Sequence, residues 1–128
     1  MSKIYNNLIL NAKEAQKLSY SPYSNVTVGA ALLTKSNKIY TGANIENSSY
    51  GATVCAERVA IFNAILNNEK DFKALAITSN LEDFTFPCGL CLQVISEFSK
   101  DMIIIITNKN GKSIEKKINE LLPYTFSL

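Results

Sequence analysis

The chain has 128 residues, of which 47% are hydrophobic and 19% are charged. This composition is typical of a globular protein and excludes a disordered chain, while the length predicts a single domain over residues 1–128. Thirteen basic and 11 acidic side chains give a formal charge of +2, without the dense basic run that would grip a phosphate backbone. We therefore expect a small, neutral or weakly charged partner and no nucleic acid.

The chain contains three cysteines and no histidine. An odd number of cysteines, two of them in Cys-x-x-Cys spacing, argues against a disulfide framework. The N-terminus lacks the apolar stretch of a signal peptide, and the longest apolar run, at residues 102–106, is too short to span a bilayer. These features predict a cytoplasmic protein that does not enter a membrane.

The first third of the chain predicts a helix followed by a strand pair. Residues from about 3 to 18 carry apolar side chains near helical spacing and end at the turn-rich segment 19–24. Residues 28–34 form an apolar strand, and residues 38–41 return as its antiparallel partner. The polar segment 42–53 is rich in Asn and Ser and is predicted to be a loop of the kind that carries function.

A second helix is predicted over residues 55–67, with Thr53 as its N-cap. It is apolar on nearly every side, so we expect it to be buried all round, which in a small domain indicates a subunit interface. Phe62 and the small-residue stripe of Ala56, Ala60 and Ala64 are interpreted as core.

The remaining elements are a strand at 74–78, a helix at 89–98, a strand at 102–107 and a fifth strand at 113–117, followed by a short helix from about 118. Together the elements predict an α/β fold, a three-layer α/β/α sandwich around a mixed five-stranded sheet.

The three cysteines form two groups along the chain. Cys55 precedes the acid Glu57 by two positions, and Cys88 and Cys91 make up the second group. Three thiolates can hold a zinc ion and leave its fourth position open, as catalytic zinc sites do. Both groups fall where a helix begins, which lowers thiol pKa values. If the two helices follow adjacent parallel strands, their N-termini meet at one edge of the sheet. Regular helical spacing places Glu57 on a different face from Cys55, but near a helix start the acid can fold back over the N-terminus.

The chain resembles the cytidine deaminases, specifically the small homotetrameric type, in four motifs that occur in the same order along the chain. Residues 55–58 and 87–91 match the zinc motifs, residues 44–47 resemble the ribose-binding segment, and residues 21–24 with 28–31 resemble the N-terminal signature. The likeness runs from about Lys13 to Phe126.

The resemblance implies a zinc-dependent hydrolase of pyrimidine salvage. One Zn²⁺ per subunit would be held by Cys55, Cys88 and Cys91, and Glu57 would carry protons while cytidine or deoxycytidine is converted to uridine or deoxyuridine with release of ammonia. The assembly implied is a homotetramer.

The resemblance also implies the contacts with the nucleoside. Asn44 and Glu46 would bind the ribose 3′-hydroxyl, and the backbone of Ala56 would help read the base. Val26 takes a place where the family commonly has phenylalanine, and Phe126 is similar to an aromatic residue that closes a neighbouring subunit's site. A carboxylate at position 46 suits a free hydroxyl and repels a phosphate, which favours nucleosides over nucleotides.

One departure from the family pattern affects the charge at the zinc site. Leu92 stands where the family usually has arginine, so Arg58 would offset the net negative charge of three thiolates on zinc alone. Leu92 could equally pack into the core.

Several alternatives stay open from the sequence. The cysteines could be a buried reduced trio or a structural zinc site completed by Glu57, and Asn44 and Glu46 could be ordinary turn residues. The function could be deamination of a cytosine-containing antibiotic or a modified nucleoside, or zinc-stabilised binding without turnover.

Overall fold

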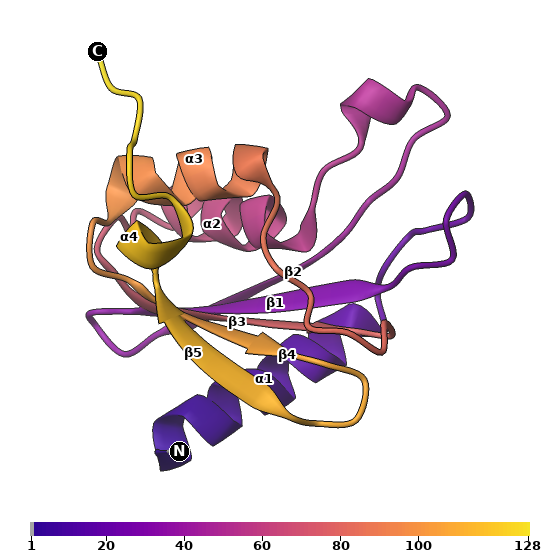
Figure 1. Cartoon of the computed structure of the whole chain (residues 1–128), viewed down its shortest axis with the longest axis horizontal. Helices are drawn as coiled ribbons and strands as arrows, with labels where there is room; N and C mark the ends of the chain where they lie inside the picture. Colours follow the sequence, from indigo (N-terminus) through magenta and orange to yellow (C-terminus); the bar gives the residue numbers. More distant parts are fainter. Residues whose placement is uncertain (1) are drawn as a thin grey trace.

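The computed structural model describes residues 2–128, which form one five-stranded sheet with helices on both faces (Figure 1). The strands are β1 (Val28–Thr34), β2 (Ile39–Ala43), β3 (Phe72–Ser79), β4 (Ile103–Thr107) and β5 (Ser113–Lys117). Their order in the sheet is β2-β1-β3-β4-β5. Only β3 and β4 pair in parallel, while the other neighbours are antiparallel. The predicted mixed five-stranded sheet is confirmed.

Helix α1 (Lys3–Gln16) covers one face of the sheet. Helices α2 (Ala56–Leu66), α3 (Gly89–Phe98) and the short α4 (Ile118–Leu121) lie on the opposite face. The chain is therefore the predicted three-layer α/β/α sandwich. Among residues 2–128, none of the helices has the length and apolar character needed to cross a bilayer.

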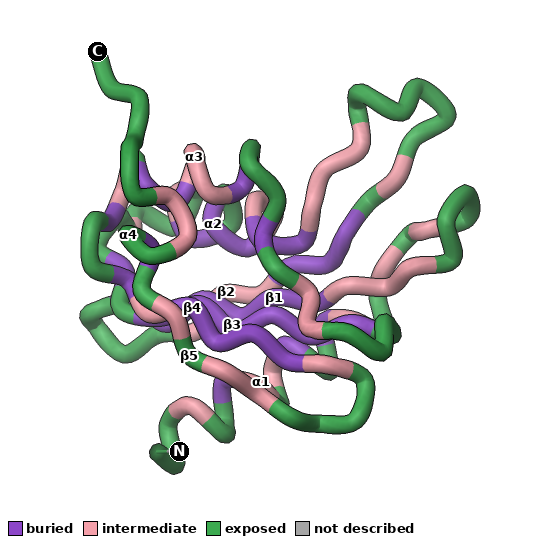
Figure 2. Tube along the Cα trace, in the orientation of Figure 1, coloured by how far each residue is buried: buried purple, intermediate pink, exposed green. Residues whose placement is uncertain are grey.

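Strands β1, β3 and β4 are the most buried part of the chain, whereas the edge strand β5 is half-buried to exposed and the loops beyond the strand ends are exposed (Figure 2). A larger apolar cluster fills the space between the sheet and α2, α3 and α4, and a smaller one lies under α1. Helix α1 presses directly on β1, because a Cβ at Gly29 would collide with the backbone of Ala12 and Gln16. Glycine is the side chain that permits this approach.

A second close approach positions the start of α2. A Cβ at Gly42 in β2 would lie 2.6 Å from the carbonyl oxygen of Ala56 and would also collide with the backbone nitrogen of Ala60. Any larger residue at position 42 would therefore push the first turns of α2 off the sheet. Those turns carry Cys55, Glu57 and Arg58.

The predicted N-cap of α2 was wrong by two residues. Cys55, and not Thr53, occupies the N-cap position with extended backbone angles, and its side chain makes no capping hydrogen bond. Thr53 instead ends a short 3₁₀ helix, η1 (Tyr50–Ala52). The sulfur of Cys55 is thus left free of the helix backbone.

The expected strand arrangement under the two cysteine groups was also wrong. Helix α2 follows β2 and α3 follows β3, but β1 lies between these strands and is antiparallel to both. The strands β2 and β3 are therefore parallel without being adjacent. The two helices share one face of the sheet, so their N-termini still meet.

Helix α2 is not buried all round. The stripe of Ala56, Ala60 and Ala64 is fully buried as predicted, but Phe62 is 43% exposed and Leu66 is 87% exposed. The interpretation of Phe62 as core was therefore wrong for the single chain. An apolar side chain of this size on an exposed helix face is the kind of feature that marks a contact surface.

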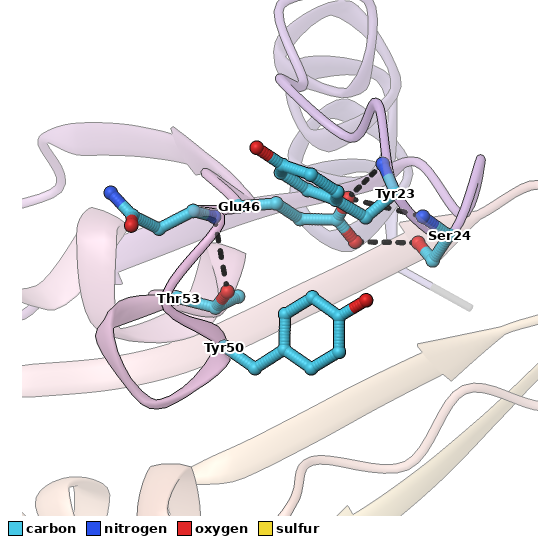
Figure 3. A pocket seen from close by; sticks show the side chains of 6 residues that line it. Tyr23, Ser24, Glu46, Tyr50 and Thr53 are labelled. Atoms are coloured by element: carbon cyan, nitrogen blue, oxygen red, sulfur yellow. Dashed lines mark hydrogen bonds between the residues drawn. The ribbon is translucent and has the colours of Figure 1, made fainter.

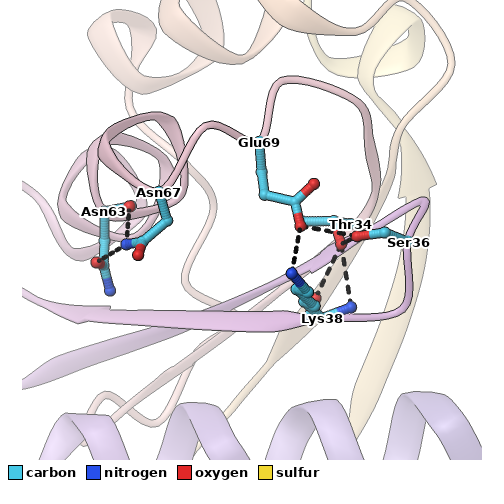
Figure 4. Close-up of polar contacts among 6 residues, drawn as sticks. All are labelled: Thr34, Ser36, Lys38, Asn63, Asn67 and Glu69. Atoms are coloured by element: carbon cyan, nitrogen blue, oxygen red, sulfur yellow. Dashed lines mark hydrogen bonds and ion pairs between the residues drawn. The ribbon is translucent and has the colours of Figure 1, made fainter.

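The end of the sheet far from the cysteines is closed by a clamp on the β1–β2 turn (Figure 4). Ser36 Oγ donates to Glu69 Oε2 at 2.7 Å, and Lys38 Nζ lies 3.9 Å from the same carboxylate oxygen. Thr34 Oγ1 lies 2.8 Å from Ser36 Oγ within the turn. These contacts tie the hairpin to the segment that follows α2.

Candidate active site

The N-termini of α2 and α3 bring the three cysteines together. Cys88 is the N-cap of α3 and Cys91 lies in its first turn. The Sγ atoms of Cys55 and Cys88 are 3.8 Å apart, those of Cys88 and Cys91 are 3.5 Å apart, and all three lie within 4.8 Å of one another. The predicted juxtaposition of Cys55, Cys88 and Cys91 is confirmed.

These sulfur atoms fit a zinc ion. Thiolates are soft donors that zinc accepts at tetrahedral corners, and both helix starts present positive dipole ends that favour thiolate over thiol. Within residues 2–128, no fourth histidine, cysteine or acid joins this group of potential ligands. The donor set is therefore that of a site with three protein ligands and room for a fourth, non-protein ligand.

The neighbours of Cys55 favour its thiolate form. The hydrogen bond from the Cys91 thiol, with further help from Arg58 and Cys88, lowers the pKa of Cys55 to about 5. The same contact with Cys55, together with burial, raises the pKa of Cys91. Of these two thiols, Cys55 therefore loses its proton more readily.

Glu57 is buried beside the sulfur atoms, with only 4% of its surface exposed. Burial raises its pKa to about 7, the Cys55 thiolate adds to this effect, and hydrogen bonds from its own backbone N–H and from Cys91 oppose it. A carboxyl group with a pKa near neutrality can both accept and release a proton at physiological pH. Its interaction with both Cys55 and Cys91 agrees with an acid that folds back over the helix start.

Arg58 is the only arginine among the 13 basic side chains, and it lies against the cysteines. Its Nη2 donates to Cys55 Sγ at 3.6 Å and approaches the carbonyl oxygen of Thr53 at 3.5 Å. Its buried Nε has no hydrogen-bond partner among residues 2–128. The hydrogen bond to Cys55 raises the pKa of Arg58, so a permanent positive charge faces the thiolates. Leu92 packs against the main core cluster instead.

A cavity of about 330 Å³ is lined by Tyr23, Ser24, Glu46, Asn47, Tyr50 and Thr53 (Figure 3), of which Thr53 lies two residues before Cys55. Glu46 is held in it from one side. Its Oε1 accepts from the backbone N–H groups of Tyr23 and Ser24 at 2.9 and 3.2 Å, and its Oε2 accepts from Ser24 Oγ at 2.5 Å. These bonds lower the pKa of Glu46, with the Ser24 hydroxyl the largest cause, so the side chain is a carboxylate at neutral pH.

The segment that carries Glu46 is paired on both sides by short backbone contacts. Ile45 exchanges hydrogen bonds with Val54 at 2.9 and 3.0 Å, and the Glu46 N–H donates to the Tyr20 carbonyl oxygen at 2.8 Å. Val54 directly precedes Cys55, so this pairing fixes the distance between the cavity and the cysteines. The predicted loop at residues 42–53 is therefore more ordered than its composition indicated.

Asn44 is buried and binds the chain itself. Its Oδ1 accepts from Ser19 Oγ at 2.5 Å and from the Val28 N–H at 2.9 Å, and its Nδ2 donates to the Val26 carbonyl oxygen at 2.8 Å. One N–H of the amide group remains available for another partner.

The other predicted contact residues are more scattered. Val26 is half-buried at the end of the loop that leads to β1, and Ala56 is fully buried at the start of α2. Phe126 is 68% exposed, and its carbonyl oxygen accepts from Gln93 Nε2 at 3.1 Å. The tail thus leaves the site of its own chain with the ring facing outward.

The sequence did not single out Ser24 or Tyr50 as site residues, although both line the cavity. Tyr50 packs edge-to-face on Tyr23 at a ring separation of 6.0 Å. The turn-forming residues 19–24 were the available signal, because hydroxyl and backbone donors in a turn are well placed to hold a carboxylate.

Comparison with known proteins places this geometry in a family. Residues 2–107 match the family described as "Cytidine and deoxycytidylate deaminase zinc-binding region". A cytidine deaminase of Sporosarcina psychrophila is 46% identical over 121 residues, covering 94% of this chain and 89% of the relative. A blasticidin-S deaminase of Bacillus cereus is 35% identical over 108 residues, covering 78% of this chain and 76% of the relative.

A solved structure agrees with the sequence relatives. The crystal structure of cytidine deaminase from Burkholderia pseudomallei superimposes with a TM-score of 0.92 at 38% identity, covering 98% of this chain and all of the other. The shared fold and the zinc-binding region together show that the chain belongs to the cytidine deaminase family.

Proposed function

We propose that the protein is a zinc-dependent hydrolase that deaminates cytidine and deoxycytidine to uridine and deoxyuridine, with release of ammonia. The observation that carries this proposal is the position of Glu57. It is a buried carboxyl group with a pKa of about 7, in contact with a trio of sulfur atoms that lacks a fourth protein ligand. A structural zinc site would have no use for a proton carrier at this position.

Cys55, Cys88 and Cys91 would hold the metal, and Arg58 would offset part of the thiolate charge. When bound, zinc supplies the acidity that makes water a nucleophile at neutral pH. Glu57 would accept a proton from the attacking water and deliver it to N3 of the pyrimidine as the new C4–O bond forms. It would then take the proton of the new C4 hydroxyl and carry it to the exocyclic amine, so that the C4 carbonyl forms and ammonia leaves as the C4–N bond breaks. Burial keeps Glu57 away from bulk water, which prevents the proton from being lost.

The cavity around Glu46 suits a sugar. Glu46 is ionised and keeps acceptor capacity beyond its contacts with Tyr23 and Ser24, and Asn44 keeps one N–H free, so together they could bind a ribose 3′-hydroxyl. The same carboxylate would repel a phosphate group. The backbone of Ala56 would read the base, and the half-buried Val26 would pack against the nucleoside.

We propose a homotetramer as the working assembly, with residues 1–128 acting as one domain. A groove of about 410 Å³ exposes apolar side chains of α2 and of the segment after β2, including Phe62, Leu66 and Ile45. A second copy of the chain would cover these side chains. The exposed Phe126 would then close the site of a neighbouring subunit. The setting proposed is pyrimidine salvage in the cytoplasm.

The proposed function is tested by ammonia release from cytidine, measured against the zinc content of the protein. We expect turnover in proportion to bound zinc, its loss after treatment with a chelator and its return when zinc is restored. A folded, zinc-loaded protein that releases no ammonia would contradict the proposal and support a binding module.

A substrate panel tests the range of substrates. The likeness to the Bacillus cereus relative, a blasticidin-S deaminase, favours one specific alternative, the deamination of a cytosine-containing antibiotic. We expect cytidine and deoxycytidine to react and cytidine 5′-monophosphate and blasticidin S to react poorly. If blasticidin S reacts better than cytidine, the antibiotic and not the nucleoside is the substrate.

A further inference from the structure

The residues that hold Glu46 belong to an irregular loop, residues 19–27, between α1 and β1. This loop has few internal bonds, which include those from the Asn25 N–H to the Ser21 carbonyl oxygen at 3.0 Å and from the Val26 N–H to Ser24 Oγ at 3.0 Å. Asn25 has a φ of +61°, a strained angle that must be held by its surroundings. The loop therefore depends on contacts from outside itself.

Asn80 supplies such a contact at the end of β3. The last residue pair of the β1–β3 ladder is Val28 with Ser79, so Asn80 lies directly beyond it. Its Oδ1 accepts from the Thr27 N–H at 3.1 Å, its Nδ2 donates to the Asn25 carbonyl oxygen at 2.9 Å, and its own N–H donates to the Thr27 carbonyl oxygen at 3.2 Å. Asn80 thus extends the hydrogen bonding of the β1–β3 ladder to Thr27 and Asn25, which lie outside the sheet.

The contacts continue without interruption from Asn80 to Glu46. Asn80 fixes the backbone on both sides of Val26, and the Val26 N–H donates to Ser24 Oγ. Because this hydroxyl oxygen accepts from Val26, its own proton is directed at Glu46 Oε2 at 2.5 Å. Asn44 grips the same segment from the buried side through the Val26 carbonyl oxygen. A third amide side chain also holds the loop, because Gln16 Nε2 donates to Thr27 Oγ1 at 3.1 Å. Of the three, Asn80 alone is exposed, and among residues 2–128 its side chain makes no hydrogen bonds beyond those to Asn25 and Thr27.

From this chain of contacts we infer that Asn80 is a positioning residue for nucleoside binding. It fixes the part of the loop at residues 19–27 that contacts Glu46, and thereby fixes the orientation of the Glu46 carboxylate. The inference rests on the proposed function, in which the Glu46 carboxylate accepts a hydrogen bond from the ribose 3′-hydroxyl. Asn80 touches neither the cysteines nor Glu57, so it affects the binding of the nucleoside and leaves the proton transfers unchanged.

The test compares zinc-loaded wild type with Asn80→Ala using cytidine. We expect KM to rise about tenfold with kcat within about twofold, because the lost contacts weaken binding of the ground state and the transition state equally. Zinc content should be unchanged. A variant that is merely destabilised would lower the folded fraction and hence kcat, with KM unchanged, and that result would overturn the inference.

Two further measurements test the route through Glu46. With 3′-deoxycytidine, which lacks the hydroxyl that Glu46 would bind, the KM ratio between Asn80→Ala and wild type should shrink to less than about twofold. An equal ratio for both substrates would contradict the route. Asn80→Asp keeps the acceptor for the Thr27 N–H and should raise KM only about threefold, as a partial rescue.

Glu69→Ala is the matched control, because it removes a side-chain clamp on a turn at the opposite end of the sheet (Figure 4). It should leave KM unchanged. Hydrogen exchange of the peptide covering residues 21–28 needs no substrate and should be faster in Asn80→Ala than in Glu69→Ala and wild type. Equal exchange in the three proteins would overturn the inference. If the wild type is inert toward nucleosides while exchange is faster in Asn80→Ala, the proposed function is overturned instead.

Discussion

The start of α2 and the loop cavity each contain a glutamate, and the pKa values of the two carboxyl groups are shifted in opposite directions. Glu57 is buried among sulfur atoms, and burial raises its pKa to about 7. Glu46 is only half-buried, and hydrogen bonds from Ser24 and Tyr23 lower its pKa. The environment thus prepares one side chain to move protons and the other to remain a charged acceptor. Within 11 residues of sequence, the fold thus gives two carboxyl groups the opposite protonation behaviour that their proposed roles in chemistry and in binding require.

The largest effect on the binding side is expected from Glu46→Gln. The amide keeps the size of the side chain but loses the negative charge and one of the two oxygen atoms that accept hydrogen bonds from Tyr23, from Ser24 and, as proposed, from the nucleoside. We expect KM for cytidine to rise about 100-fold with kcat within about threefold, measured by steady-state ammonia release. Glu115→Gln, a change at the exposed face of β5, serves as the control. A fall in kcat without a change in KM would break the separation between the two glutamates.

A smaller effect on the chemical side is expected from Arg58→Ala. Loss of the guanidinium removes the positive charge 3.6 Å from Cys55 Sγ, so zinc affinity should fall about tenfold while KM stays unchanged. Competition with a zinc-binding dye measures the affinity. The loss should exceed that in a relative with a second arginine at the position of Leu92, and an equal, small loss in both proteins would show that Arg58 does not offset the thiolate charge alone.

The smallest effect is a shift in the titration of Glu46. Ser24→Ala removes the largest cause of its lowered pKa, so the pKa should move up toward the ordinary 4.5. A carboxyl group with a lowered pKa keeps its charge, and its contribution to binding, until the pH falls through that pKa. KM of the variant should therefore begin to rise at a higher pH than KM of the wild type. Carbon NMR of the side chain measures the midpoint, and an unchanged value would contradict the assignment.

Sequence patterns predicted the layers and the sulfur trio because both depend on local signals. Apolar runs at strand or helix spacing identify each element, and thiols at helix starts identify a metal site. The strand order was less accessible, since nothing in the local sequence says that β1 inserts between β2 and β3. The exposure of Phe62 was misjudged for a related reason, because an apolar helix face looks the same whether the chain itself or a partner covers it.

The binding side of the site was the harder part to predict. Asn44 and Glu46 were found through resemblance, but the donors that orient Glu46 are a hydroxyl and two backbone N–H groups from residues 23 and 24. Backbone donors carry no mark in the sequence. Asn80 lies more than 50 residues from the loop that it holds, and only the β1–β3 pairing brings them together.

The most direct test of the account is Glu57→Gln, examined for zinc content and turnover in the same preparation. The variant keeps the three sulfur ligands but cannot carry a proton, so we predict that it binds as much zinc as wild type while kcat falls by about 1,000-fold or more. A variant that turns over within about tenfold of wild type, or that loses zinc in step with its activity, would contradict the role of Glu57 as the proton carrier.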